Sequence, residues 1–193
     1  MAKDLAEMTL TELWKLFPIV HTAHNPAWAA WYAEEAAALA AAFGARRRRT
    51  SHIGSTAVPG LTAKPTVDIL LELAPGLTDA EILDRLRPGG WLPMGASPEP
   101  DWRLDLNKGY TPQGFAERVF HLHLRRPGDW DELYFCEYLK RHPEAAAEYA
   151  ALKLRLGEEF RHHRDHYTEA KTPFIREHTA RARAEFPGKF LPG

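Results

Sequence analysis

The chain has 193 residues, 45% of them hydrophobic, and a formal net charge of −1 at pH 7. This length and composition fit one globular domain with a substantial core. The near-neutral charge argues against a nucleic acid as partner, since nonspecific nucleic-acid binding normally requires a strongly basic domain. A single cysteine, Cys136, excludes an intramolecular disulfide. No apolar run is long enough to span a bilayer and residues 1–7 lack a signal-peptide core, so we expect a cytoplasmic protein without a membrane partner.

The first predicted element is a short helix near the N-terminus. Thr9 and Glu12 have the spacing of a capping box, an apolar stripe follows them, and Pro18 ends the helix. We therefore assign residues 1–17 to an N-terminal extension helix and residues 18–193 to the main domain.

A long, alanine-rich helix is predicted next. Asn25 has the position of an N-cap, Pro26 that of the first helical residue, and the helix runs to about Phe43 before Gly44 ends it. Its larger apolar residues fall near one face, which favours packing against a core over contact with a ligand.

Two β-strands are predicted on either side of a small turn. A run of four arginines at 46–49 leads into a strand that ends near Ile53, and the apolar segment 67–73 forms the next strand. Because successive side chains of a strand point to opposite faces, Asp68 and Glu72 lie on one face of this second strand, and the other face is continuously apolar. Glu72 is too far along the strand to join Asp68, so we interpret it as a rim carboxylate or an ion-pair partner. The four arginines would divide between two faces, which favours a solvated edge over a nucleic-acid site.

The second half of the chain is predicted to hold further strands and a group of helices. A helix begins at Thr78, a third strand begins near Trp91, and the strand 117–124 follows later. Between them, segment 95–113 is rich in Pro, Gly, Asp and Asn and favours a loop or an irregular strand pair. The tryptophans, including Trp102, are interpreted as core or rim residues, and contact of Trp102 and Tyr110 with a ligand ring is the alternative. Three C-terminal helices are predicted, one capped by Asp129, one opened by Pro143 and one following Thr172-Pro173.

The turn Gly54-Ser55 and the carboxylate of Asp68 suggest nucleotide chemistry. A Gly-Ser pair after a strand lets backbone N–H groups approach an anion, and the hydroxyl adds a donor. A carboxylate at the start of an apolar strand can hold a cation such as Mg²⁺ that bridges to substrate phosphates. The alternative for Asp68 is a carboxylate satisfied by nearby backbone N–H groups. Lys64 lies between the turn and Asp68, either within reach of a phosphate or as a solvated loop lysine.

Two histidines form a second candidate group. His121 and His123 occupy alternate positions of a predicted strand, so their imidazoles point to the same face and can converge on a phosphate or a metal ion. A structural role for both histidines is the alternative. Arg118 lies on the opposite face by the same alternation.

These motifs together resemble the GrpB-like family of the nucleotidyltransferase superfamily, over about residues 18–182. The segment from His52 to Leu70 carries the core of the resemblance. Matching segments elsewhere are Asn25-Pro26-Ala27-Trp28, the His-x-His strand Phe120-His121-Leu122-His123-Leu124, Tyr138-Leu139-Lys140-Arg141-His142-Pro143-Glu144, Tyr149-Ala150-Ala151-Leu152-Lys153, and the positions Arg164, Tyr167 and Lys171.

The resemblance implies an α/β or α+β fold with a nucleotidyltransferase-like mixed β-sheet, flanking helices and a C-terminal helical layer, and with the His-x-His strand beside the Asp68 strand. It implies a nucleoside triphosphate or another phosphorylated small molecule as ligand, Mg²⁺ or Mn²⁺ as cofactor, and transfer of a nucleotidyl group to an unknown acceptor. Catalytic and metal-binding roles are expected for Asp68, His121 and His123. Phosphate contacts are expected from Gly54, Ser55, Lys64, Lys153, Tyr167 and Lys171.

One position departs from the superfamily pattern. The superfamily places a second acidic residue two positions after the first, and this chain has Leu70 there. A rival interpretation is therefore a noncatalytic ligand-binding or folding-assistance module, which agrees with the fusion of GrpB-like domains to dephospho-CoA kinase in some bacteria. The sequence leaves open the base, the acceptor and the oligomeric state.

Overall fold

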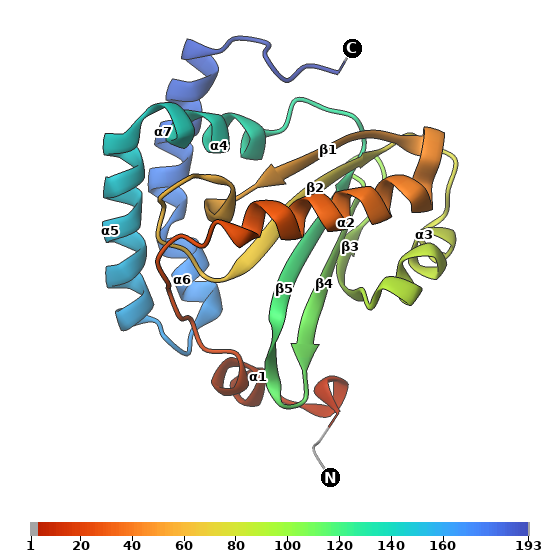
Figure 1. The fold of residues 1–193 in the computed structure, drawn as a ribbon, viewed down its shortest axis with the longest axis horizontal. Coiled ribbons are helices and arrows are strands. Elements are labelled where there is room, and N and C mark those ends of the chain that lie inside the picture. Colours follow the sequence, from red (N-terminus) through yellow and green to blue (C-terminus); the bar gives the residue numbers. More distant parts are fainter. Residues whose placement is uncertain (1–3, 193) are drawn as a thin grey trace.

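A five-stranded mixed β-sheet forms the centre of the computed structural model, which describes residues 4–192 (Figure 1). Residues 1–3 of the predicted N-terminal extension, and residue 193, lie outside the described residues. Across the sheet the strands follow the order β1 (Arg47–Ile53), β2 (Thr66–Leu73), β5 (Gly114–Arg125), β4 (Arg103–Thr111) and β3 (Leu92–Ser97). Strands β2 and β5 run parallel, and the other neighbours pair antiparallel. The predicted mixed sheet, with the His-x-His strand beside the Asp68 strand, is confirmed.

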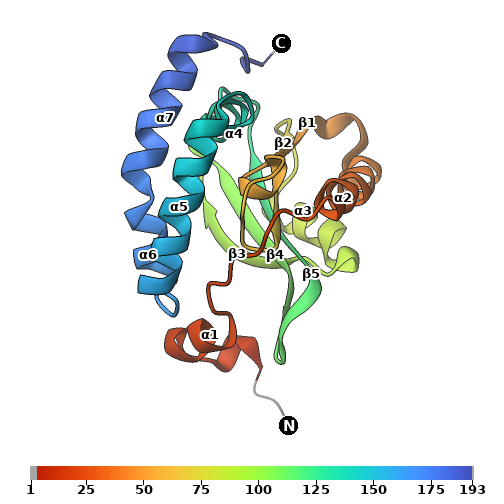
Figure 2. The same cartoon turned by 60° about the vertical axis from the view of Figure 1, so that its left-hand side comes forward.

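Helices cover the sheet in two layers (Figure 2). One layer consists of α2 (Ala27–Phe43) and α3 (Asp79–Leu86), and the other of α4 (Asp131–Arg141), α5 (Pro143–Glu159), α6 (Arg164–Ala170) and α7 (Thr172–Glu185). The predicted C-terminal helical layer is thus present. Helix α1 (Leu10–Leu16) lies near the β4–β5 hairpin, where Phe17 packs its ring on Tyr110 and Phe115. Within residues 4–192, no helix combines the length and apolar character that crossing a membrane requires.

Local capping fixes where the first helices begin. The Thr9 hydroxyl accepts the backbone N–H of Glu12 at the start of α1, and Thr78 and Glu81 repeat this capping box at α3. At α2, the side chain of Asn25 accepts the backbone N–H of the first helical residue at 3.0 Å. These three starts agree with the sequence prediction to within a residue.

The main core lies between the sheet and the layer formed by α2 and α3. The alternating residues of β2 that were predicted to be apolar point into it, together with the even-numbered apolar residues of β5. The buried members from β2, α2 and α3 are Val67, Ile69, Leu71, Leu73, Trp28, Leu39, Phe43, Ile82 and Leu86. On the opposite face, Leu70 packs with Ile53 and Leu133 in a separate small cluster. Asp68 lies on that opposite face, which is covered by the C-terminal helices.

The composition of segment 95–113 left open either a loop or an irregular strand pair. The structure shows a strand pair there, because β3 and β4 pair antiparallel with one register shift. Trp102 does not contact a ligand pocket: it is buried in the main core, and its indole N–H donates to Asp79 at 2.8 Å. The suggestion that Trp102 meets a ligand ring is therefore wrong. Tyr110 instead hydrogen-bonds His121 at 2.8 Å.

Two further predictions are corrected by ion pairs that the sequence did not reveal. Asp129 does not cap α4, because the Asp129 carboxylate accepts from Arg183 at 2.6 Å. Helix α4 begins at Asp131 without a side-chain cap. Arg49 is not part of a solvated edge: its guanidinium pairs with the buried carboxylate of Glu72 at 2.6 Å. Glu72 is thus an ion-pair partner, one of the two roles expected for it.

Candidate functional site

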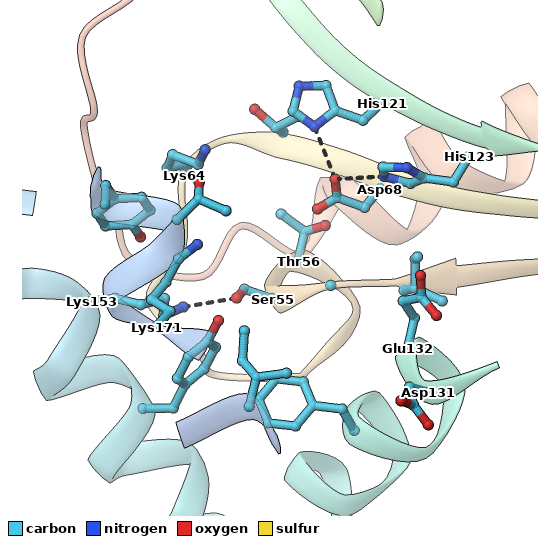
Figure 3. A pocket seen from close by; sticks show the side chains of 18 of the residues that line it. Ser55, Thr56, Lys64, Asp68, His121, His123, Asp131, Glu132, Lys153 and Lys171 are labelled. Carbon is cyan, nitrogen blue, oxygen red and sulfur yellow. Dashed lines mark hydrogen bonds and ion pairs between the residues drawn. The ribbon is translucent and has the colours of Figure 1, made fainter. Parts of the chain in front are cut away.

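The register of the sheet brings two carboxylates and two histidines together. Asp68 on β2 lies opposite His121 on the parallel strand β5, and Leu70 lies opposite His123. On the other side of β5, Asp105 of β4 lies opposite His123. Paired residues of neighbouring strands share a face, so these polar side chains all point toward the helical layer, as Figure 3 shows for three of them.

Asp68, His121 and His123 converge on one point. The Asp68 Oδ1 atom lies 3.1 Å from His121 Nδ1 and 3.7 Å from His123 Nε2. One ligand-type atom from each of the three residues lies within 4.8 Å of the other two. Burial by itself would raise the pKa of Asp68, but hydrogen bonds and charge from the two histidines hold that pKa well below its ordinary value. The carboxylate is therefore ionised at neutral pH.

Each imidazole also has an outer partner. His123 Nδ1 lies 2.9 Å from the carboxylate of Asp105, which in turn accepts from Arg125 at 2.9 Å. His121 Nε2 lies 2.8 Å from the hydroxyl of Tyr110. Burial lowers the pKa of His123, but its hydrogen bonds to Asp105 and Asp68 outweigh that effect and raise the pKa to about 9. Asp105 was missed by sequence reasoning, because only the β4–β5 register reveals that it meets His123.

The turn after β1 is shaped around the Asp68 carboxylate. Gly54 has a φ of +70°, a region that strongly favours glycine, and an added Cβ atom would lie 2.4 Å from Asp68 Oδ2. Ser55 follows at the start of a single 3₁₀ turn, Ser55–Ala57. Glycine at position 54 is thus required both by the backbone conformation and by the close approach of the carboxylate.

Lys153 reaches this turn from the helical layer. It lies on α5, is only 3% exposed, and donates from Nζ to Ser55 Oγ at 2.9 Å and to the Thr62 carbonyl oxygen at 2.5 Å (Figure 3). The sequence alone could not distinguish this buried position from a solvated helix face.

The ring of Tyr167 contacts the other two lysines of the pocket. The Lys171 ammonium group lies over the Tyr167 ring at 4.2 Å from its centroid, and that of Lys64 lies at 5.6 Å. The Tyr167 hydroxyl is 2.8 Å from His21 Nε2, so the buried ring has a fixed position.

Lys64, Lys153 and Lys171 line one pocket. Burial, followed by the charge of the other cationic groups, lowers the pKa of Lys64 and Lys153 to about 7. Burial lowers the pKa of Lys171 to about 8. A bound anion would stabilise the charged form of all three side chains.

All nine residues predicted from the sequence line one pocket of about 420 Å³: Gly54, Ser55, Lys64, Asp68, His121, His123, Lys153, Tyr167 and Lys171. The structure brings them together, and their chemical roles remain predictions. Arg164, which belongs to the family-like segment, lines the pocket as well, and so do Asn107, Glu132, Phe135 and Ile175, which were not singled out. No periodicity marks these last four as sharing a site, because they come from β4, α4 and α7.

Comparison with known proteins shows which family the chain belongs to. The family model of the GrpB protein matches residues 18–181. A UPF0157 protein of Pseudomonas aeruginosa is 34% identical over 161 residues, which cover 83% of this chain and 66% of that protein. A UPF0157 protein of Bacillus subtilis is 30% identical over 156 residues, which cover 79% of this chain and 44% of that protein.

A solved structure agrees with these matches. The crystal structure of the conserved protein GrpB from Enterococcus faecalis superposes with a TM-score of 0.72 at 29% identity, over 86% of this chain and 99% of that one. The chain spans just under two thirds of the Pseudomonas relative and less than half of the Bacillus relative. Because the family model covers most of its length, the chain belongs to the GrpB family.

Proposed function

We propose that the pocket binds a nucleoside triphosphate or a related phosphorylated ligand together with a divalent cation, and that it transfers a nucleotidyl group to an acceptor. The observation that carries the proposal is the meeting, in one pocket, of the Gly54-Ser55 turn, the Asp68 cluster and the three lysines. The sequence resemblance to the nucleotidyltransferase superfamily gives the reaction class.

The phosphate groups would lie on the lysine side of the pocket. Lys153 already donates to the Ser55 hydroxyl, so a phosphate oxygen at this turn meets an ammonium group and a hydroxyl at once. Lys171 and Lys64 line the same pocket, and both lie over the ring of Tyr167. Charge that grows on the phosphoryl oxygens during transfer would be stabilised by these fixed ammonium groups.

A divalent cation would be held by Asp68, His121 and His123. Their carboxylate oxygen and two imidazole nitrogens fit Mn²⁺, one of the two ions expected from the resemblance, because Mn²⁺ accepts both kinds of donor. When bound, the ion would neutralise phosphate charge and polarise the phosphoryl group. Phe135 and Ile175 also line the pocket, and their apolar side chains suit the faces of a nucleoside.

Calorimetry against the four common nucleoside triphosphates, with and without Mn²⁺, tests this proposal. We expect metal-dependent binding that Asp68→Asn abolishes while the fold is retained, because this carboxylate serves a ligand and not the core. Asp101→Asn is the matched control, since Asp101 is exposed and does not line the pocket. Absence of nucleotide binding, or equal binding by Asp68→Asn, would contradict the proposal.

A noncatalytic binding module is the second candidate, and one observation favours it. Leu70 is fully buried against Ile53 and Leu133, so β2 offers one carboxylate to the pocket where the superfamily pattern has two. Release of pyrophosphate from a bound triphosphate separates the candidates. Tight, metal-dependent nucleotide binding without pyrophosphate release across a panel of hydroxyl and amine acceptors would favour the module.

A further inference from the structure

We propose that Asp68, His121 and His123 form a site for a divalent transition-metal ion, with Zn²⁺ bound more tightly than Mn²⁺ and Mg²⁺ rejected, and that Asp105 and Tyr110 fix the two imidazoles for ligation. The inference deepens the proposed function and rests on it for the role of the ion. The binding of the ion itself can be measured without any nucleotide.

The donor atoms argue for the choice of metal. Mg²⁺ takes oxygen ligands in a near-ideal octahedron, whereas imidazole suits zinc, iron, copper and nickel, and Mn²⁺ tolerates both. At this point of the pocket the protein offers one carboxylate and two imidazoles. The position that would supply a second carboxylate on β2 is Leu70. Two other carboxylates line the pocket: Asp131 is already paired with Arg183 at 2.6 Å, and Glu132 is not among the donors that lie within 4.8 Å of one another.

The geometry also fits an ion. Two donors that each lie about 2.1 Å from a metal are separated by roughly 3.0 Å in an octahedral site and 3.4 Å in a tetrahedral one. The carboxylate oxygen of Asp68 lies 3.1 Å from His121 Nδ1 and 3.7 Å from His123 Nε2, so small side-chain rotations place all three around one ion. The remaining coordination positions face the 420 Å³ pocket, where a water molecule or a phosphate oxygen can enter.

The outer partners distinguish these histidines from ordinary surface residues. A metal-binding histidine almost always donates its second ring N–H to a carboxylate, carbonyl oxygen or water molecule, which selects the tautomer and the ring orientation. His123 presents Nδ1 to Asp105 at 2.9 Å, and His121 presents Nε2 to the Tyr110 hydroxyl at 2.8 Å. In both rings the nitrogen left over is the one that faces Asp68.

Both outer partners are themselves held in place. The guanidinium group of Arg125, which is 5% exposed, donates to the Asp105 carboxylate at 2.9 Å. Arg164 donates to the Tyr110 hydroxyl at 3.1 Å. Asp105 and Tyr110 are therefore positioning residues, which act on the ion through the histidines.

Metal binding to the chelator-treated full chain is the first test, with Zn²⁺, Mn²⁺ and Mg²⁺ as the probes. We expect one Zn²⁺ per chain, and an affinity for Mg²⁺ that is at least about 100-fold weaker. The visible d–d bands of bound Co²⁺ report its coordination geometry, and a change of these bands in the histidine variants shows that the imidazoles are ligands. His121→Ala and His123→Ala should each lose the ion, and the control is His142→Ala, a partly exposed histidine outside the pocket that is paired with Glu144 and Glu185.

Substitutions that exchange donors give the sharper test. The double variant His121→Asp, His123→Asp should gain affinity for Mg²⁺ and show a smaller preference for Zn²⁺ than the unmodified chain, because it offers oxygen donors only. Asp105→Asn should weaken Zn²⁺ binding by roughly 10- to 100-fold without abolishing it, and Tyr110→Phe should weaken it less. A role in folding alone would change thermal stability in these variants but leave metal affinity unchanged.

The outcomes separate this inference from the proposed function. Mg²⁺ binding as tight as Zn²⁺ binding, or Zn²⁺ retained after loss of both histidines, overturns the metal assignment and leaves nucleotide binding standing. Stoichiometric Zn²⁺ binding at these residues, with no nucleotide bound in its presence, supports the metal site and contradicts the nucleotidyl-transfer proposal.

Discussion

At the scale of single residues, Gly54 and Asp68 constrain each other. The Asp68 carboxylate lies where a side chain at position 54 would have to be, since an added Cβ atom comes within 2.4 Å of Oδ2. The same carboxylate accepts from His121 and approaches His123. A change at Gly54 therefore reaches the histidines through Asp68, without touching either of them.

Gly54→Ala should lose metal binding as well as stability. The backbone at φ +70° and ψ −172° lies in a region that essentially only glycine adopts and strains alanine by on the order of 1–3 kcal/mol, and the methyl group displaces Asp68 from the two imidazoles. Thermal unfolding and metal affinity are the two measurements. Gly60→Ala is the matched control: Gly60 also has a positive φ, but a Cβ atom there meets nothing within 4 Å, so it should lose stability and keep the metal.

Lys171→Ala should weaken binding of a triphosphate by about 10-fold and leave binding of the parent nucleoside unchanged, because the lost contact is a charge-assisted one to phosphate. Competition calorimetry with the two ligands measures the difference. The control is Lys15→Ala, an exposed lysine of α1 outside the pocket. Equal weakening of both ligands would assign Lys171 to the structure of the pocket wall instead.

At the scale of elements, the helical layer and the sheet contribute different chemistry. Strands β2 and β5 carry the carboxylate and the imidazoles, and α5 and the α6–α7 junction carry Lys153 and Lys171. Since the lysine of α5 donates to the Ser55 turn, the two layers are joined by polar contacts across the pocket. Lys153 and Lys171 of the cationic wall thus lie on the helical layer, and Lys64 joins them from the segment before β2.

The stability of the ligand-free protein should rise with pH between about 7 and 9.5. The pKa of Lys153 is about 7 when folded and about 10.4 in an unfolded chain, so over this range the unfolded state binds more protons and unfolding becomes less favourable as protons are removed. Lys64 and Lys171 act in the same direction. His123, whose folded pKa is raised to about 9, opposes the three lysines up to that pH, because its contribution to stability is lost as it deprotonates. Denaturant unfolding at several pH values measures the slope, which is at most about 1.4 kcal/mol per pH unit for each lysine.

Lys153→Met should flatten this slope and raise the free energy of unfolding at pH 7 by on the order of 1–2 kcal/mol, because an apolar side chain avoids the cost of burying a charge. The same variant should bind triphosphate more weakly. A control at the exposed Lys15, changed to Met, should leave the slope as it is. An unchanged slope in Lys153→Met would show that this ammonium group is not desolvated in the folded state.

The elements themselves were largely readable from the sequence, and the contacts between them were not. Capping residues such as Thr9 and Thr78 act within four residues, so the starts of α1 and α3 followed from local chemistry. The alternation along β5 correctly gave a shared face for the two histidines. Asp105 and Glu132 could not be found in this way, because their places in the site depend on the sheet register and on the docking of α4.

At the scale of the whole molecule, the pocket is the space between a sheet face and a helical layer that are far apart in sequence. The opposite sheet face is filled by the main core, with α2 and α3 packed on it. The sheet face toward the C-terminal helices carries a small apolar cluster around Leu70. Polar side chains on the same face line the pocket. The main core therefore lies on the sheet face away from the pocket. The effects of pocket substitutions on ligand binding can thus be measured without large losses of core packing.

The contact between Lys153 and Ser55 has a consequence for the order of folding. It joins positions 98 residues apart, and closing so long a loop is entropically unfavourable until the sheet and the helices have each formed. We expect the pocket to be among the last parts to assemble and the first to open.

A bound triphosphate should then slow unfolding in stopped-flow measurements while leaving the refolding rate nearly unchanged. The native protein should lose the docked helices before it loses the sheet.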